Sequence, residues 1–260
     1  MLRKVSDFQG LTIGATDGDI GEIHDVYFDD QSWTVRYLVV DTGTWLSGRR
    51  VLISPMSLRD SYVGVDRLHV ALTKAQVEQS PHVDTAKPVS RQHETELSRY
   101  YGYPYYWTGP YRWGLDPYPV LMTEPRRSAV EEEMLARERE SADPHLHSIR
   151  DVMGYYIQAA DDDVGHVEDF LVDDKAWAIR YMLVDTRNWL PGKKVLISPE
   201  WIREVSWADS KVFVDLRRDA IERAPGYDES RPIERAHEGR LYEHYGRRKY
   251  WEDEEDRPAA

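Results

Sequence analysis

Short runs of apolar residues alternate with turn-forming residues along much of the chain. The stretches IGEIHDVYF (20–28) and WTVRYLVVD (33–41) are rich in β-branched and aromatic residues, which favour β-strands. Between them lies DDQS, a run of turn formers, so the pattern predicts a β-hairpin. Alternate positions of the second stretch are largely apolar on both faces, which is typical of a central strand.

The same pattern occurs twice. The stretch RYLVVDTGTWLSGRRVLISP (36–55) returns as RYMLVDTRNWLPGKKVLISP (180–199), 144 positions later. Without any gap, 18 of the 35 residues in 21–55 are identical to those in 165–199. This period is much longer than the roughly 20–50 residues of a solenoid repeat, so it indicates a duplicated domain.

Each copy contains about five or six predicted strands with no long helix between them. The strands RVLIS and KVLIS end at Pro55 and Pro199, because proline cannot donate a hydrogen bond to a sheet. Closure into a barrel would remove the exposed edges of so small a sheet. We therefore expect a mainly β fold with two small, closed or half-closed barrels, and one continuous sheet through both halves would contradict separate barrels.

The predicted organisation has four parts: barrel 1–85, connecting segment 86–145, barrel 146–229 and C-terminal segment 230–260. Each barrel is followed by short helices, and in the first of the longer ones Ser90 is the expected N-cap and Gly102 the C-terminal stop. A second, acidic helix is expected at 128–140. The last ten residues, WEDEEDRPAA, are predicted to be a disordered charged tail.

Both copies contain the motif W-x-x-R-Y-x-x-V-D-T-x-x-W-L-x-G-[RK]-[RK]-V-L-I-S-P, after a glycine-led strand and an Asp-Asp turn. This motif resembles the PRC-barrel family. The family is named for the cytoplasmic domain of the photosynthetic reaction centre H subunit and is shared with the ribosome maturation factor RimM. The resemblance covers roughly 1–85 and 145–229, and it implies two tandem PRC-type β-barrels.

The charge balance narrows the class of partner. The formal charge is −13, which argues against direct binding of nucleic acid, itself a polyanion. The chain has no cysteine, so disulfides, thiolate nucleophiles and cysteine-ligated metals are excluded. No stretch approaches the ~18–20 apolar residues of a membrane span, and we expect an acidic, cytoplasmic protein.

Residues 100–118, YYGYPYYWTGPYRWGLDPY, contain nine tyrosines and tryptophans in nineteen positions. We name this segment the aromatic arm. An exposed arm of this composition would be an adhesive recognition surface. We favour the alternative that the arm lays its rings on a barrel of its own chain or of a sister chain, because an exposed apolar strip promotes aggregation. The rings singled out for interaction or packing are Tyr105, Tyr106, Trp107 and Trp113.

Candidate metal ligands are few. Glu22 and His24 share one face of a predicted strand, and the second copy carries the same pair in reverse order, as His166 and Glu168. If the two strands met, the four side chains could converge on a divalent ion. We favour two exposed charge pairs instead. The Asp-rich turns TDGDIG and DDDVG lack the spacing of an EF-hand calcium loop, so we expect no metal and no cofactor.

A His-Glu dipeptide is retained in both copies, as His93-Glu94 and His237-Glu238. Neighbours on a helix point in different directions, so we expect each histidine to pack on its barrel and each glutamate to face water. The sequence contains no glycine-rich phosphate loop, nucleophile elbow or metal-spaced histidine motif. We therefore expect a protein that is not an enzyme.

The leading functional hypothesis is a scaffold that binds a protein partner. Trp33, Trp45, Trp177 and Trp189 recur in both copies and fit a shared packing role, within an intramolecular pseudo-dimer or a homo-oligomer. One alternative is a soluble relative of the reaction centre H subunit, peripheral to a membrane electron-transfer complex. A second is a ribosome-assembly factor of the RimM type, and a third is a metal-binding protein or an enzyme.

Overall fold

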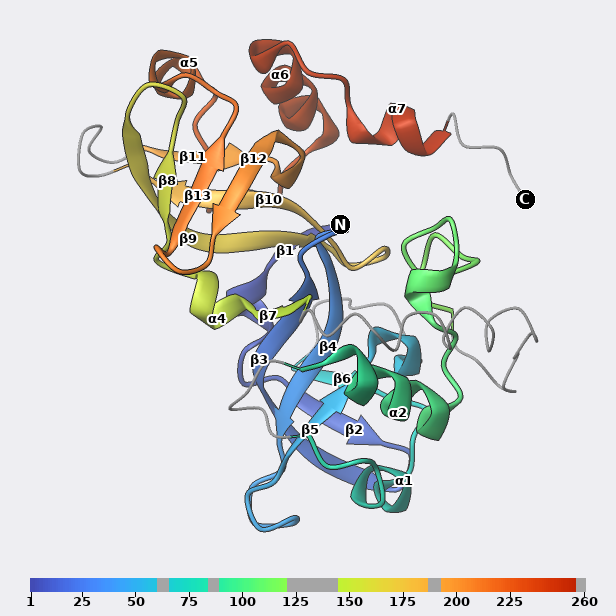
Figure 1. The fold of residues 1–260 in the computed structure, drawn as a ribbon. Helices are drawn as coiled ribbons and strands as arrows, with labels where there is room; N and C mark the ends of the chain where they lie inside the picture. Colours follow the sequence, from blue (N-terminus) through green and yellow to red (C-terminus); the bar gives the residue numbers. More distant parts are fainter. Residues whose placement is uncertain (60–65, 84–88, 121–144, 187–192, 256–260) are drawn as a thin grey trace. The chain divides into compact units, whose positions relative to one another are not determined.

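The computed structural model describes residues 1–59, 66–83, 89–120, 145–186 and 193–255 (Figure 1). The predicted acidic helix at 128–140 lies outside the described residues. The chain divides into two compact units. The N-terminal unit contains Arg3–Val152 and Val172–Ile179, and the C-terminal unit contains Met1–Leu2, Met153–Leu171 and Arg180–Ala260.

The N-terminal unit is built on a hydrogen-bonded set of short strands in the order β5-β4-β3-β2-β6, with β7 paired to the end of β3. β2 and β6 are parallel, and the other pairs along this order are antiparallel. The elements before the helices are β1 (Leu2–Lys4), η1 (Val5–Phe8), β2 (Thr12–Ala15), β3 (Gly18–Asp29), β4 (Thr34–Asp41), β5 (Arg50–Ile53), η2 (Pro55–Ser57) and β6 (Arg67–His69). Later in the chain come β7 (Leu146–Ser148) and α4 (Ile149–Val152).

The C-terminal unit repeats this order as β11-β10-β9-β8-β13-β12, again with one parallel pair, β8 and β13. Its strands are β8 (Tyr156–Gln158), β9 (Asp163–Asp173), β10 (Ala178–Asp185), β11 (Lys194–Ile197), β12 (Ile202–Ser206) and β13 (Lys211–Val214), with η4 (Pro199–Trp201) between β11 and β12. The strands at the two ends of this order, β11 and β12, are consecutive in the chain. The short helix η4 connects them, and no β-ladder between them is described. The mainly β fold is confirmed, but among the described strands hydrogen bonds do not close the predicted ring.

The predicted hairpin is confirmed, with β4 starting one residue later than expected. Asp29 receives hydrogen bonds from the backbone of Gln31 and Ser32, which fixes the turn. Trp33 has φ +49°, and Trp177 at the equivalent position of the second copy has φ +55°. This left-handed conformation cannot continue a strand, so each tryptophan ends a turn.

The turn of the second copy pairs with β4 inside the N-terminal unit. The backbone N–H of Val35 donates to Trp177 O at 2.8 Å, and that of Ile179 donates to Trp33 O at 2.8 Å. Because β10 thereby joins β4, the described strands belong to one hydrogen-bonded set of 13. The expectation of a separate sheet for each copy is therefore wrong. A chain that buries two matching turns against each other satisfies backbone groups that two isolated sheets would leave at their edges.

The glycine that leads the long strand of each copy is required by a close backbone approach. A Cβ atom at Gly21 would lie 2.0 Å from Asp41 O, and one at Gly165 would lie 2.0 Å from Asp185 O. Both contacts are far below van der Waals distance, so no other residue fits without moving the neighbouring strand. The glycine and the aspartate of the family-like motif therefore form one structural unit in each copy.

Short helices follow the strands. They are α1 (Lys74–Glu78), α2 (Arg91–Tyr101) and η3 (Tyr106–Thr108) after the first copy, and α5 (Arg218–Arg223), α6 (Arg235–Tyr245) and α7 (Tyr250–Glu255) after the second. The predicted ends of α2 are confirmed, since Ser90 Oγ accepts a hydrogen bond from His93 N and Gly102 adopts the left-handed conformation. The prediction of a disordered C-terminal tail is wrong for 251–255, which belong to α7.

The core of the N-terminal unit lies between the strands and α2. Leu97 of α2 packs with Tyr37 and Val39 of β4 and with Leu52 of β5, together with Tyr27, Val83, Val89 and Leu146. Helix α2 thus buries one face against the sheet. The polar residues Arg91 and Glu94 of α2 therefore lie where the helix meets the aromatic arm.

Candidate functional site

A buried carboxyl group lies at the centre of the most conspicuous polar cluster in the N-terminal unit. Glu94 is only 1% exposed. Its Oε1 atom lies 3.0 Å from Nη1 of Arg91, and its Oε2 atom accepts a hydrogen bond of 2.6 Å from the Tyr106 hydroxyl. Arg91 Nη1 also donates to Tyr106 Oη at 2.8 Å, so the three side chains form a closed triangle. We name Glu94, Arg91 and Tyr106 the first cluster.

Local helix geometry and the arm bring these groups together. Arg91 and Glu94 are three residues apart on α2, which puts them on one face. Tyr106 starts η3 in the aromatic arm and returns its hydroxyl to that face. From the sheet, Arg36 of β4 lays its guanidinium 3.5 Å from the centre of the Tyr106 ring. The arm is thereby held from two sides.

Arg36 is itself fully paired at its terminal nitrogens. Its Nη2 atom donates to Asp29 Oδ2 at 3.0 Å and to Ser32 Oγ at 2.9 Å, and its Nη1 atom donates to Arg112 O at 2.5 Å. Arg36 and Asp29 are both buried. Burial acts to raise the pKa of Asp29, but the charge of Arg36 and the hydrogen bonds from Arg36, Gln31 and Ser32 together lower that pKa below its ordinary value. This ion pair ties the first hairpin turn to the arm.

Burial also changes the acidity of the first cluster. It raises the pKa of Glu94 to about 7, with the charge of Arg91 and the Tyr106 hydrogen bond acting in the opposite direction. Burial and the nearby charge of Glu94 raise the pKa of Tyr106 well above its ordinary value. A carboxyl group of this kind can exchange a proton near neutral pH. All described side-chain partners of Glu94 belong to the first cluster. We therefore interpret Glu94 as a structural group that holds the arm on α2.

The C-terminal unit contains an equivalent cluster of Glu238, Arg235 and Tyr250, which we name the second cluster. Glu238 is 3% exposed, and its Oε2 atom lies 3.0 Å from Arg235 Nη1. Its Oε1 atom accepts hydrogen bonds of 2.9 Å from the hydroxyls of both Tyr250 and Tyr181. Arg235 donates to Tyr250 Oη at 2.8 Å, and Arg180 lies 3.9 Å from the centre of the Tyr250 ring.

The two clusters use the same positions of the repeat. The pairs Arg36/Arg180, Tyr37/Tyr181, Arg91/Arg235, Glu94/Glu238 and Tyr106/Tyr250 are all 144 residues apart. In both, the helix arginine also lies over the tryptophan that follows the tyrosine, at 4.2 Å for Trp107 and 4.3 Å for Trp251. The register of these residues was the sequence signal that could have revealed both clusters.

The predicted orientation of the two His-Glu dipeptides is wrong. Glu94 and Glu238 are buried, whereas His93 and His237 are only partly buried. The reason is that each glutamate finds an arginine and at least one phenol, which offset the cost of removing its charge from water. The arginines lie three residues earlier on the same helix, whereas the phenols come from segments twelve residues later and, for Glu238, also from β10.

The other predicted packing residues lie at different depths. Trp177 is buried and its ring centre lies 5.3 Å from that of Phe8, while Trp33 is half-buried and stacks on Phe28 at 5.1 Å. Trp45 is half-buried beneath the ammonium group of Lys74, at 4.3 Å. Trp189 lies outside the described residues.

The arm residues pack on their own unit. Tyr105, Tyr106 and Trp113 are buried, and Trp107 is half-buried. Trp113 Nε1 donates a hydrogen bond of 2.9 Å to Ala176 O, in the part of the second copy that belongs to the N-terminal unit. The arm therefore contacts both the first barrel and the turn docked on it.

The candidate metal ligands have other partners. Glu22 is exposed, and His24 Nε2 lies 2.8 Å from Arg150 Nη1, where burial followed by the charges of Arg50 and Arg150 lowers the pKa of His24. Glu168 pairs with Lys194 at 2.5 Å, and His166 lies 3.9 Å from Asp185. Within the described ranges, no group of three or more histidines and carboxylates could hold a metal ion.

Comparison with known protein families places both copies in a single domain type. The family model described as PRC-barrel domain matches residues 2–77 and 144–221, more than half of the 260 residues. No match was found among curated proteins. Of the helices that the structure describes, none combines the length and apolar character needed to span a membrane.

Proposed function

The chain belongs to the PRC-barrel domain family, and on this premise we propose that it is a non-catalytic interaction module, in which a duplicated PRC-barrel presents the aromatic arm to a protein partner. The buried ionisable groups support this proposal, because the first and second clusters use their charges internally. The net charge of −13 favours a well-solvated setting, and we propose the cytoplasm.

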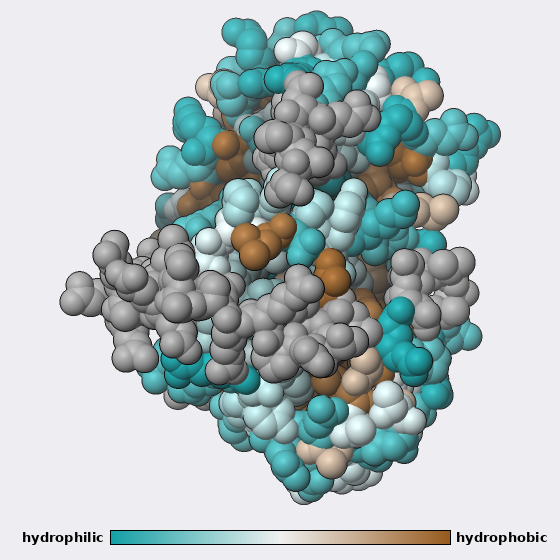
Figure 2. Space-filling model, turned by 90° about the vertical axis from the view of Figure 1, so that its right-hand side faces the viewer, coloured by the Kyte–Doolittle hydropathy of each residue, from teal (hydrophilic) through white to brown (hydrophobic). Residues whose placement is uncertain are grey.

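The observation that carries the proposal is the contrast between the two ends of the arm. Its first part is anchored, whereas Leu115 and Tyr118 near its end are 72% and 50% exposed, and Val120, two residues beyond the arm, is 45% exposed. Three large apolar residues thus reach solvent within six positions, next to rings that are rigidly packed. Figure 2 shows mainly hydrophilic residues on the face in view, with apolar residues surfacing in only a few places. Apolar and aromatic groups on a fixed support are typical of the centre of a protein interface.

The partner of this surface is either a second copy of the chain, giving a homo-oligomer, or a different protein. Serine at Leu115, Tyr118 and Val120 removes the exposed apolar groups, and serine at Tyr156, an exposed tyrosine elsewhere, is the matched control. Sedimentation velocity of the purified full chain measures self-association. A photo-crosslinking residue at position 118, compared with one at position 156, identifies a different protein in native cells.

Concentration-dependent association, or a crosslinked protein whose binding is reproduced with purified components, supports the proposal if the triple variant loses it and the Tyr156→Ser variant keeps it. A strict monomer that yields the same crosslinks from both positions would overturn it. Co-sedimentation of the unaltered chain with small ribosomal subunits would assign the ribosome-assembly alternative instead.

A second candidate is association with a membrane electron-transfer complex, as a relative of the reaction centre H subunit. The observation that favours it is Glu94, whose pKa burial raises to about 7. Such a carboxyl group can accept and release a proton near neutral pH while hydrogen-bonded to a phenol. Co-fractionation of the full chain with native membranes, lost on washing with high salt, would support this role; recovery of the chain only in the soluble fraction would contradict it.

A further inference from the structure

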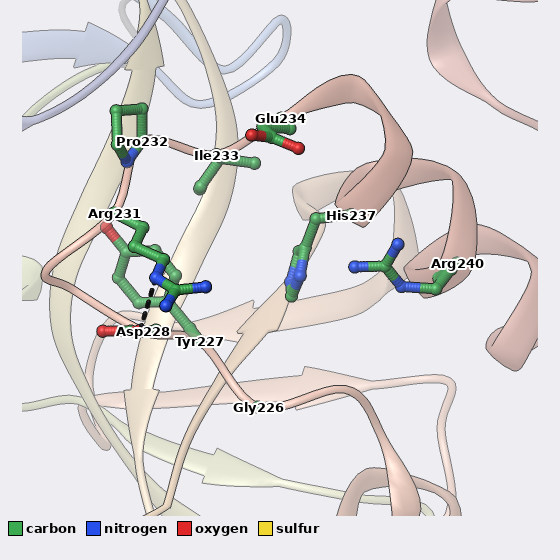
Figure 3. Close-up of a pocket in the computed structure, with 9 residues that line it drawn as sticks. All are labelled: Gly226, Tyr227, Asp228, Arg231, Pro232, Ile233, Glu234, His237 and Arg240. Carbon is green, nitrogen blue, oxygen red and sulfur yellow. Dashed lines mark ion pairs between the residues drawn. The ribbon is translucent and has the colours of Figure 1, made fainter.

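A hollow of about 290 Å³ lies in the C-terminal unit beside the start of α6. This volume is at the lower end of the ~300–1,000 Å³ typical of small-molecule sites. Tyr227, Pro232 and Ile233 supply an apolar wall, and His237 and Arg240 project from α6 (Figure 3). The hollow is separate from the second cluster, because Arg235 and Glu238 are directed to Tyr250.

Two side chains that line this hollow, His237 and Arg240, have hydrogen-bonding atoms without a described partner. The Nε2 atom of His237 is buried and has no hydrogen-bond partner. The exposed guanidinium of Arg240 has no ion pair or hydrogen bond with any residue that the structure describes. Figure 3 shows the His237 ring standing between the guanidinium groups of Arg240 and Arg231. A buried polar atom without a partner is costly, so this position favours a bound polar group.

The other charged residues that line the hollow form no described bond with His237 Nε2 or with the Arg240 guanidinium. Arg231 is engaged with Asp228, at 3.5 Å between Nε and Oδ2. Glu234 is exposed at the rim, next to the first turn of α6. Burial and the charge of Arg240 lower the pKa of His237, which favours its neutral imidazole. In the tautomer with its proton on Nε2, it donates a hydrogen bond and adds no charge.

The first copy keeps the histidine but lacks the arginine. The residue equivalent to Arg240 is Glu96, and the residue equivalent to His237 is His93, whose Nδ1 atom lies 3.2 Å from Ser90 Oγ. The equivalents of Tyr227 and Ile233 are Val83 and Val89, which belong to the hydrophobic core. Among the described residues of the first copy, a glutamate thus replaces Arg240 and core valines replace the apolar wall, so these positions provide an internal control.

We propose that this hollow binds a small organic acid, whose carboxylate is held by Arg240 and by Nε2 of His237 and whose apolar body rests on Tyr227 and Ile233. Arginine recognises a carboxylate with two parallel donors, and an imidazole N–H can complete the remaining acceptor site. The apolar wall favours a ligand with a flat or branched hydrocarbon part over a bare inorganic anion.

The test uses the full chain with isotope-labelled histidine, observed by NMR at constant ionic strength. Sodium benzoate is the probe, benzyl alcohol is the uncharged control, and inorganic phosphate is the control for charge alone. We expect benzoate to shift the imidazole signals of His237 in a saturable manner and to leave those of His93 unchanged. Benzyl alcohol and phosphate should produce at least about tenfold weaker effects, since each lacks one half of the recognition.

Two variants test the assigned residues. Arg240→Glu introduces the first-copy residue, and Arg240→Gln removes the charge without reversing it; each should weaken benzoate binding about tenfold or more. Arg223→Glu, at an exposed arginine of α5, makes the same charge change away from the hollow and should leave binding unchanged. The peptide acetyl-Ala-Phe separates the two sources of a carboxylate: tighter binding of benzoate assigns a free acid, and tighter binding of the peptide assigns a chain end.

The proposal is overturned if no saturable shift occurs at His237 with either carboxylate, or if Arg240→Gln binds as tightly as the unaltered chain. Equal binding of phosphate and benzoate would also overturn it, because charge alone would then explain the effect. Circular dichroism of each variant confirms that its fold is retained, which is expected because Arg240 has no described partner to lose.

Discussion

The first and second clusters have the same members and differ in how many donors reach the buried glutamate. Glu94 receives Arg91 and one phenol, that of Tyr106, whereas Glu238 receives Arg235 and two phenols, those of Tyr250 and Tyr181. The comparison teaches that a glutamate can stay buried in both copies when each of its carboxyl oxygens has at least one donor. Losing one member leaves a charge or donor buried without a partner, which costs more than the net value of the bond.

The residues that surround the clusters differ much more between the two copies than the clusters themselves. In the first copy Ser90 caps α2, and Val83 and Val89 pack in the core. In the second copy Glu234 occupies the cap position of α6 without a side-chain cap, and an open hollow replaces the packed valines. Residues around the clusters can vary because a substitution there costs little stability. One copy can therefore acquire a binding site while the buried cluster is retained.

The largest expected effect tests the ion pair that supports the first cluster. Arg36→Met removes the guanidinium and leaves Asp29 buried without its cation, so the free energy of unfolding should fall by about 3–5 kcal/mol. Urea unfolding of the full chain measures the change. Adding Asp29→Asn to this variant should recover part of the loss, since the uncompensated charge is then gone. A loss below about 1 kcal/mol for Arg36→Met alone would show that the pair does not support the arm.

A pH dependence should distinguish Glu94 from its neighbours. Burial raises the pKa of Glu94 from 4.5 to about 7, so the folded chain binds its proton more tightly than the unfolded chain. Its contribution to stability is therefore largest below pH 4.5 and decreases as the pH rises through 7, by about 2–3 kcal/mol. Urea unfolding between pH 5 and 8 should show a smaller decrease for Glu94→Gln than for the unaltered chain.

The matched control for this pH series is Glu96→Gln, on the exposed side of the same helix. It should retain the pH dependence of the unaltered chain. Identical slopes for the Glu94→Gln variant and this control would contradict the assignment of the raised pKa to Glu94.

Removing one phenol from each cluster tests the difference between them. Tyr106→Phe leaves Oε2 of Glu94 with no donor among the described residues, whereas after Tyr250→Phe both oxygens of Glu238 keep one. We expect a loss of about 2 kcal/mol for the first variant and about 1 kcal/mol for the second. Urea unfolding gives both values, and a larger loss for Tyr250→Phe would reverse the order that the two donor sets imply.

The smallest expected effect concerns the helix caps. Ser90→Ala removes a hydrogen bond to the first turn of α2 and should cost about 1 kcal/mol. Glu234→Ser supplies the missing cap to α6 and should stabilise the chain by a few tenths to about 1 kcal/mol. Thermal unfolding under one buffer condition compares them. Opposite signs for the two substitutions are required, and a gain from Ser90→Ala would contradict the cap.

The sequence predicts the strands and the duplication well because both depend on local, periodic signals. The hairpin formed by β3 and β4 follows from turn formers between two apolar runs, and the same signals recur 144 residues later. The pairing of the two hairpin turns could not be predicted, because Trp33 and Trp177 show only that the turn recurs and not that the two turns share backbone hydrogen bonds. A contact between distant turns leaves no periodic mark in either one.

The clusters were missed for a related reason. A glutamate beside a histidine on a helix is expected to face water, because burying an isolated charge is costly. The partners that reverse this preference, Tyr106 and Tyr250, lie twelve residues later, in the aromatic arm and directly before the segment predicted to be a disordered tail. The retained spacing of arginine, glutamate and tyrosine in both copies was the available evidence. Buried polar networks of this kind are visible only when the two copies are compared residue by residue.

The central claim is that a buried glutamate holds the aromatic segment that follows it, and a double-mutant cycle between Glu94 and Tyr106 tests it most directly. Free energies of unfolding are measured for Glu94→Gln, Tyr106→Phe, their combination and the unaltered chain. We predict a coupling energy of about 1–2 kcal/mol, since the two side chains share one hydrogen bond in a buried setting. Additive losses, with a coupling energy near zero, would contradict the claim.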